Sequence, residues 1–174
     1  MSIIKILQYP DTKLRKKGEK VTDFGPELQK IVDDMFDTHY AADNCAALAA
    51  TQLDFDNPKH ITVIDFSEKR NTPLCLINGE IIEREGEQHE EEGCMSVGVE
   101  NGALFEKVTR AMKIKIRAHD RHGKEFTMEA EGFMAKCIQH ELDHLDGKLF
   151  IDHLSPLKRN RITDKIKKLK RAKK

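Results

Sequence analysis

The segment His140-Glu141-Leu142-Asp143-His144 holds the residues of this 174-residue chain that are best suited to metal chemistry. Positions four apart on an α-helix lie one above the other on the same face, so the two imidazoles can bind one metal ion. Glu141 stands beside the first imidazole, where its carboxylate can reach a water in an open coordination position. Gly147 stands where such a helix would end. The segment predicts a metal-binding helix, against the alternative of an exposed helix that merely contains His and Glu.

The third ligand that a catalytic metal site needs is best supplied by a residue upstream of this helix. Proteases with such a helix usually take it from downstream, but Phe150 occupies the position where one such family has a third His. His153 comes three residues later. Cys94, in a short Gly-marked segment, completes a Cys-His-His set with His140 and His144 and leaves one position open.

Cys137 is the competing sulfur ligand, but its spacing is unsuitable. It lies seven residues before His144, which corresponds to about 10 Å along a helix axis. Ligand bonds of about 2.0–2.3 Å require near contact. Cys137 is therefore interpreted as a small buried residue that lines the floor near the site.

Three segments together resemble the signature motifs of the peptide deformylases. The first two are Gln139-His140-Glu141-Leu142-Asp143-His144-Leu145-Asp146-Gly147 and Glu92-Gly93-Cys94-Met95-Ser96. The third is Cys45-Ala46-Ala47-Leu48-Ala49-Ala50-Thr51-Gln52, where the family has Gly-x-Gly-x-Ala-Ala-x-Gln, so both glycines are replaced. The similarity runs in the same order from Ile6 to the basic C-terminus and covers essentially the whole chain.

The resemblance implies removal of the N-formyl group from the N-terminal formyl-methionine of new polypeptides, with release of formate. Glu141 would act as the general base, and the Gln52 amide and the Met95 backbone N–H would stabilise the oxyanion. Substrate contacts would fall on four further residues: Ala47, Leu48, Gly93 and Cys137. Because glycine allows close approach of a peptide, Cys45 and Ala47 are expected to narrow the cleft, and Gly98, where many members have proline, to loosen the loop that carries Cys94.

The expected cofactor is one divalent metal ion per chain. A Cys-His-His set suits zinc, iron, cobalt or nickel, so the ligands do not identify the metal. The resemblance favours Fe²⁺, with Zn²⁺ or Ni²⁺ present after purification.

Length and composition favour one soluble domain over residues 1–174, and the resemblance implies that it is a peptide deformylase-like catalytic domain. Charged residues make up 34% of the chain and no apolar run approaches membrane-spanning length. Four cysteines without an export signal predict free thiols in the cytoplasm. Net charge is zero, but residues 157–174 contain ten Lys or Arg and one Asp. This basic block, about 156–174, predicts contact with a polyanion, and the resemblance suggests the ribosome exit region; the alternative is a solvated helical face.

The remaining periodicity predicts an α+β fold of mostly antiparallel strands around the central helix. An N-terminal helix opens at Pro26 and a basic C-terminal helix at Pro156, while 61–64 and 74–77 are typical of buried strands. Residues 112–117 and 125–128 alternate like a hairpin. His39, His60, His89, His119, His122 and His153 are interpreted as surface or structural residues.

Two other functions remain open at this point. A zinc endopeptidase could use the same helix, although Phe150 argues against it. A ribosome-binding relative with weak or no activity would need neither Cys94 nor Glu141. The expected partners are nascent formyl-methionyl chains and the ribosome, without DNA or membrane, and the chain is expected to be a monomer.

Overall fold

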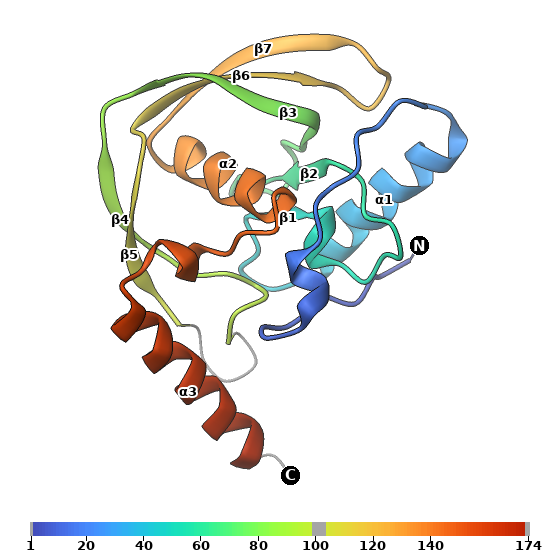
Figure 1. Cartoon of the computed structure of the whole chain (residues 1–174). Coiled ribbons are helices and arrows are strands. Elements are labelled where there is room, and N and C mark those ends of the chain that lie inside the picture. The colour runs from blue at the N-terminus through green and yellow to red at the C-terminus, as the bar shows by residue number, and fades with distance from the viewer. Residues whose placement is uncertain (1, 99–103, 173–174) are drawn as a thin grey trace.

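The helix that carries the two histidines lies in the middle of the molecule. In the computed structural model, which describes residues 2–98 and 104–172, this helix is α2 and spans Gly132–Leu145. Strands pass over it and beside it, while α1 (Pro26–Ala41) and α3 (Pro156–Ala172) lie towards opposite ends of the molecule (Figure 1). Gly147 follows α2 with a φ of +77°, a conformation that favours glycine, so the expected helix end is confirmed.

The strands form two antiparallel sheets. The larger sheet has the order β1-β2-β3-β6-β7 and consists of β1 (Ala47–Ala49), β2 (Ile61–Ile64), β3 (Leu74–Glu85), β6 (Lys113–His119) and β7 (Glu125–Glu131). The smaller sheet pairs β4 (Gln88–Glu92) with β5 (Glu106–Arg110). The expected α+β class, with antiparallel strands around a central helix, is confirmed.

The predicted hairpin forms because its apolar residues alternate. Ile114, Ile116 and Ala118 of β6 are buried, and β6 pairs with β7 without a register shift. The turn is held by Asp120, whose Oδ1 accepts hydrogen bonds from the backbone N–H groups of His122 and Lys124 at 2.8 and 3.0 Å. This arrangement buries one face of the hairpin over α2 and its neighbours.

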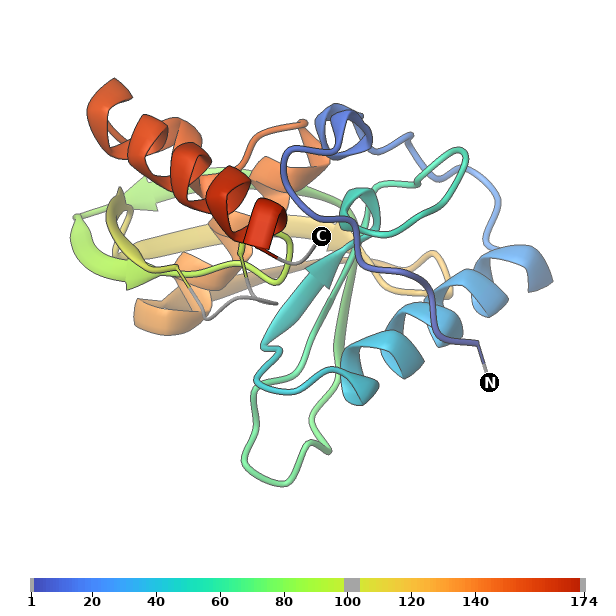
Figure 2. The same ribbon diagram turned by 90° about the horizontal axis from the view of Figure 1, so that it is seen from below.

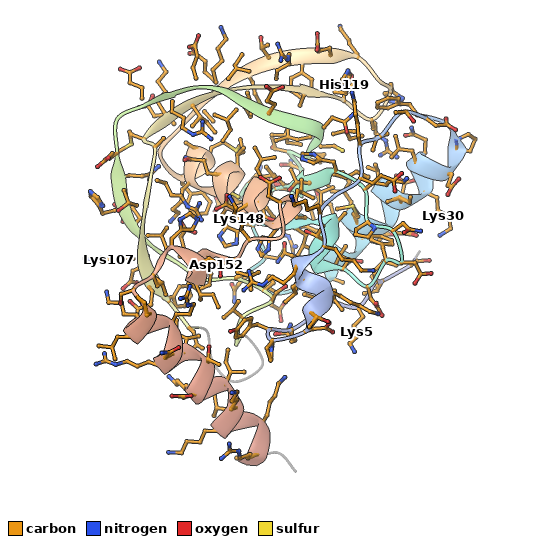
Figure 3. All side chains as sticks on the ribbon, in the orientation of Figure 1. Lys5, Lys30, Lys107, His119, Lys148 and Asp152 are labelled. Carbon is orange, nitrogen blue, oxygen red and sulfur yellow. The ribbon has the colours of Figure 1, made fainter. Side chains whose placement is uncertain are left out.

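The helix α3 packs through one narrow apolar face. Ile162 and Ile166 are buried and Tyr9 Oη lies 3.1 Å from Thr163 Oγ1, whereas most of its basic side chains are exposed. Figure 2 shows α3 on the outside of the molecule, away from α1. The segment that leads from α2 to α3 carries Asp152 (Figure 3), which pairs with Arg15 at 2.6 Å. Lys173 and Lys174 of the predicted basic block lie outside the described residues.

Neither β4 nor β5 is predicted from the sequence, because the residues of both strands are mostly charged or polar. Gln88 and Glu92 at the two ends of β4 are nevertheless buried. The Gln88 amide donates to the carbonyl groups of Ala111 and Gly132 at 3.0 and 2.9 Å, which ties β4 to the start of α2. Of the helices described, none is long and apolar enough to cross a membrane.

Candidate metal centre and substrate cavity

Three candidate ligand atoms meet between α2 and the turn that follows β4. Cys94 Sγ lies 3.3 Å from His144 Nε2, and His144 Nε2 lies 3.1 Å from His140 Nε2. One ligand atom from each residue lies within 4.8 Å of the other two, and all three side chains are buried. Tetrahedral bonds of the usual lengths place such ligand atoms about 3.3–3.6 Å apart. The donor set and its spacing therefore fit one metal ion, and the structure brings together the residues that the sequence predicts.

The imidazole of His140 is held in one orientation from behind. Its Nδ1–H donates to Glu92 Oε1 at 2.9 Å, which leaves Nε2 free to face Cys94 and His144. Arg110 in turn donates to both oxygens of Glu92, through Nε at 2.9 Å and Nη2 at 3.0 Å. Its Nη1 donates to Asp143 at 2.6 Å. Glu92 and Arg110 are supporting residues to which the sequence analysis assigns no role.

The two histidines of the cluster have opposite pKa shifts. Burial alone would lower the pKa of His140, but Cys94 and Glu92 outweigh it and raise that pKa to about 10. Burial and the charges of His140 and Arg110 hold the pKa of His144 well below its usual value. Without a metal, the His140 imidazole would therefore hold a proton at neutral pH. A divalent cation can take its place, which is the behaviour expected of a metal site.

Glu141 lies beside the ligands in a buried position. Its Oε1 is 3.9 Å from His140 Nε2, and Oε2 has no hydrogen-bond partner among the residues that the structure describes. Burial raises the pKa of Glu141 to about 7, with His140 lowering it and Glu92 raising it. A buried carboxyl group whose pKa lies near neutrality is suited to accept and return a proton.

Gln52 reaches the cluster from the short helix Ala50–Gln52 that follows β1. Its Oε1 accepts from the Ala49 backbone N–H at 2.9 Å, which fixes the amide orientation. Its Nε2 donates towards Ser96 Oγ at 3.2 Å and Cys94 Sγ at 3.4 Å. Gln52 therefore points its donor group at the sulfur ligand.

A cavity of about 650 Å³ opens beside these groups. Among its lining residues are several that the sequence analysis selects: Ala47, Gln52, Gly93, Cys94, Met95, Cys137, His140 and Glu141. Leu48 is fully buried and does not line the cavity. Cys137 lines it as a buried free thiol, as expected.

One expectation about the departures from the family motif needs correction, and a second stays a prediction. Cys45 does not narrow the cavity, because its thiol is buried 3.3 Å from His39 Nδ1 and 3.4 Å from the Ala47 carbonyl. Gly98 is buried with a φ of +75°, and a Cβ there would lie 2.7 Å from Leu104 Cδ1. Glycine at this position is therefore favoured by the backbone conformation. The expectation that it loosens the loop stays a prediction, because residues 99–103 lie outside the described part of the chain.

An α+β fold whose central helix places two histidines and a glutamate beside a buried cysteine defines the chain as a metal-dependent hydrolase of the deformylase type. Residues 3–160 match the family model of polypeptide deformylase, and the chain belongs to this family. Metal-dependent deformylation is the function of the family. The chain is accordingly a member of the peptide deformylase family of hydrolases. This membership favours deformylation over the two alternatives, an endopeptidase and a non-catalytic relative.

Relatives match along nearly the full chain. Peptide deformylase 1 of Coxiella burnetii is 65% identical over 169 residues, which cover 97% of this chain and 98% of that protein. The crystal structure of a peptide deformylase from Legionella pneumophila is 42% identical, with a TM-score of 0.89 and coverage of 99% and 98% of the two chains. The enzyme from Ehrlichia chaffeensis in complex with actinonin is 34% identical, with a TM-score of 0.87 and coverage of 98% and 99%.

Proposed function

We propose that this hydrolase removes the formyl group from the N-terminal formyl-methionine of nascent polypeptides with one divalent metal ion bound by Cys94, His140 and His144. The observation that carries the proposal is the convergence of these three ligand atoms beside the buried carboxyl group of Glu141. We further propose that residues 1–174 act as one catalytic domain in the cytoplasm, as a monomer.

Different residues of the chain have different roles in the proposed hydrolysis. A metal ion in this site supplies Lewis-acid chemistry, which acidifies water and draws charge from a carbonyl oxygen. Glu141 takes a proton from the attacking water and later delivers it to the departing amine, which releases formate. The Gln52 amide and the Met95 backbone N–H donate to the oxygen on which charge develops; each such donor contributes about 3–4 kcal/mol. Gln52 can donate to this oxygen when one of its two amide N–H groups gives up its hydrogen bond to Ser96 Oγ.

The peptide substrate is held by the open edge of β1. The Asp65 N–H donates to the Ala46 carbonyl at 3.0 Å, so these two residues form a hydrogen-bonded pair between the strands. In an antiparallel ladder the next residue then turns its N–H and C=O away from the partner strand. Ala47 therefore offers both groups to an added strand, and its carbonyl, which also accepts from the Cys45 thiol at 3.4 Å, can accept a second hydrogen bond. Gly93 and Cys137 border the methionine side chain, whereas Leu48 contributes by packing beneath β1.

Fe²⁺ is the ion that we propose for the cell, with Zn²⁺ or Ni²⁺ as replacements after purification, on the basis of the family resemblance. Actinonin is present in the Ehrlichia structure. We expect it to bind this chain in the same cavity and to protect the metal-loaded protein against thermal unfolding.

Two measurements test the proposal together. Metal analysis of Cys94→Ala should show nearly complete loss of the ion, whereas Cys75→Ala, which changes a half-buried thiol outside the cluster, should retain it. A full metal complement in Cys94→Ala would refute the ligand assignment and restore Cys137 as a candidate. Formate release from a formyl-Met peptide, without cleavage of an unblocked casein-like protein, separates deformylation from endopeptidase activity. The reverse result would refute the function.

The basic face of α3 is proposed to dock on ribosomal RNA phosphates near the exit region. It contains no aromatic residue, so phosphate contact would dominate and binding would weaken steeply with salt. Deleting α3 would uncover the residues packed against Ile162 and Ile166, so substitution is the better test. The test changes three exposed lysines to glutamine: Lys165, Lys167 and Lys168. The control changes three exposed lysines elsewhere: Lys17, Lys20 and Lys69.

The lysine variant of α3 should co-sediment with ribosomes more weakly at physiological salt and should hydrolyse short formyl-Met peptides normally. The control variant should behave like the parent chain. Equal loss of ribosome binding in both variants would show that overall charge, and not the face of α3, is responsible.

A further inference from the structure

We propose that the free edge of β7, the side opposite β6, is a docking site for an extended segment of a partner protein in which basic and apolar residues alternate. The segment would pair with β7 as an added strand of the larger sheet. None of the β7 residues lines the substrate cavity, so this surface is separate from the candidate metal centre.

The strand β7 has a neighbouring strand on one side only. It is the last strand in the order β1-β2-β3-β6-β7. Among the described residues, its backbone pairs with β6 alone. Figure 1 shows β7 at the outer rim of the molecule, at the opposite end of the view from α3. A strand bound to β7 would therefore leave the basic face of α3 accessible.

The hydrogen bonds at the two ends of β7 show which of its backbone groups are free. The Gly132 N–H donates to the Met112 carbonyl, and the Asp120 N–H donates to the Lys124 carbonyl, both at 2.9 Å. Both pairs join even-numbered residues, and the register of β6 and β7 has no shift between them. Because alternate pairs of an antiparallel ladder are hydrogen-bonded, the odd-numbered residues of β7 direct their N–H and C=O groups to the free edge. These residues are Glu125, Thr127, Glu129 and Glu131.

The side chains of the same four residues determine which charge a partner needs. All four are exposed, and they share the outer face of the sheet because side chains alternate along a strand. A strand paired with the free edge places one of its own side chains directly opposite each of them. Opposite charges in such pairs stabilise the pairing, and like charges destabilise it. Three glutamates therefore select a partner with lysine or arginine at alternate positions.

The strand β6 is an example of such a partner on the other side of β7. Basic and apolar residues alternate along it from Lys113 to Arg117. Lys113 Nζ lies 3.7 Å from Glu129 Oε2. Arg117 Nε lies 3.8 Å from Glu125 Oε1. The two glutamate side chains are still 62% and 61% exposed, so a second basic strand can reach them from the free edge.

The inner face of β7 accounts for the apolar residues of the proposed partner. Phe126 and Met128 pack against the core cluster that includes Ile114 and Ile116, but they are only half-buried. The alternate side chains of an added strand would lie on this face and cover both residues. Burial of this apolar surface adds to the affinity that the backbone hydrogen bonds provide.

A second copy of β7 is a poor partner for the same edge. In the antiparallel pairing of two full-length β7 strands, Glu125 of each copy lies opposite Glu131 of the other. Like charges directly opposite one another destabilise a sheet, so the edge favours a basic strand over a copy of itself.

The test uses three acetylated and amidated peptides with the full chain. The probe is Lys-Ile-Lys-Ile-Arg-Ala, which copies β6. One control, Glu-Ile-Glu-Ile-Glu-Ala, keeps the alternation and reverses the charge, and the other, Lys-Lys-Arg-Ile-Ile-Ala, keeps the composition of the probe and loses the alternation. Calorimetry should give the probe an affinity about tenfold higher than that of either control.

Charge reversal on β7 should reverse this preference. The double variant Glu125→Lys with Glu129→Lys should bind the acidic alternating peptide about tenfold more tightly than the probe. The control variant Glu27→Lys with Glu68→Lys makes the same charge change at exposed positions outside β7 and should keep the order of the parent chain. A preference for the probe that survives the β7 reversal would overturn the inference.

Amide hydrogen exchange tests the register in the unmodified chain. The N–H groups of Thr127 and Glu129 should exchange faster than those of Phe126 and Met128, and saturation with the probe should slow them about tenfold. Protection elsewhere without any change at Thr127 and Glu129 would overturn the proposal, as would equal affinity for all three peptides. A dimer of the free chain that the β7 reversal dissociates would assign the edge to a second copy and would overturn it as well.

Discussion

Replacing Glu92 by glutamine is expected to weaken both the fold and the metal site. The change keeps the shape of the side chain and removes its charge. Glu92 accepts hydrogen bonds from His140 Nδ1 and from two nitrogens of the buried Arg110. In Glu92→Gln, Arg110 retains only Asp143 as a carboxylate partner, and the amide has a single acceptor oxygen to divide between Arg110 and His140.

The size of the effect follows from the pKa of Glu92. Burial alone would raise that pKa, but His140 and Arg110 outweigh it and lower it from 4.5 to about 2. A folded-state pKa below the unfolded value contributes stability that is fully present above pH 4.5 and is lost as the pH falls towards 2. The difference corresponds to about 3 kcal/mol at neutral pH. Loss of the hydrogen bond to His140 should also weaken metal affinity by about 10- to 100-fold.

The assay is urea unfolding of metal-free parent and variant chains between pH 7 and pH 3. The parent should be more stable than Glu92→Gln by about 3 kcal/mol at pH 7, and this difference should shrink below pH 4.5. Glu91→Gln, at the exposed neighbouring position of β4, serves as the matched control and should change stability by less than about 0.5 kcal/mol. A difference below 1 kcal/mol for Glu92→Gln at pH 7, or one independent of pH, would refute this reasoning.

Three further changes test the site. Glu141→Gln should keep the fold and the metal but lose about 10²–10⁴-fold in kcat, because an amide cannot accept the proton; a loss within tenfold would show that Glu141 is not the base. Gly98→Ala should lower unfolding free energy by about 1–3 kcal/mol, since its φ of +75° disfavours a Cβ that would also meet Leu104; unchanged urea stability would contradict this. Ala47→Gly should lower KM for formyl-Met peptides by widening the cavity, and an unchanged or higher KM would count against it.

The metal-binding helix and the hairpin could be predicted because their signals are local. Two histidines four residues apart occupy one face of any α-helix, and the alternating residues of β6 require one buried face of any sheet. The prediction that Cys94 binds the same metal as this helix also depended on the family motif. Cys94 and the helix are far apart in the sequence and come together only in the folded chain. Short charged strands such as β4 give no such signal, since their burial depends on partners elsewhere.

The supporting contacts of the site could not be predicted in this way. Arg110 reaches Glu92 only because β4 pairs with β5, and nothing in the sequence of either strand indicates a buried ion pair. The inward direction of the Cys45 thiol likewise depends on His39 of α1, which packs behind β1. The contact between Phe66 and Phe133 joins residues 67 positions apart through the meeting of a loop and a helix start.

The short length of β1 bears on when a new polypeptide can bind as substrate. An open sheet edge is a general hazard, because edges of other molecules can pair with it and aggregate. Here the edge spans three buried residues and ends at once in the turn Ala50–Gln52, so a flat strand from a folded protein finds no length to pair with. On the proposed binding mode, a free, extended chain end is the segment that fits this edge. The reaction would then be limited in time, because it would have to occur before the first residues of a new protein are incorporated into a fold of their own.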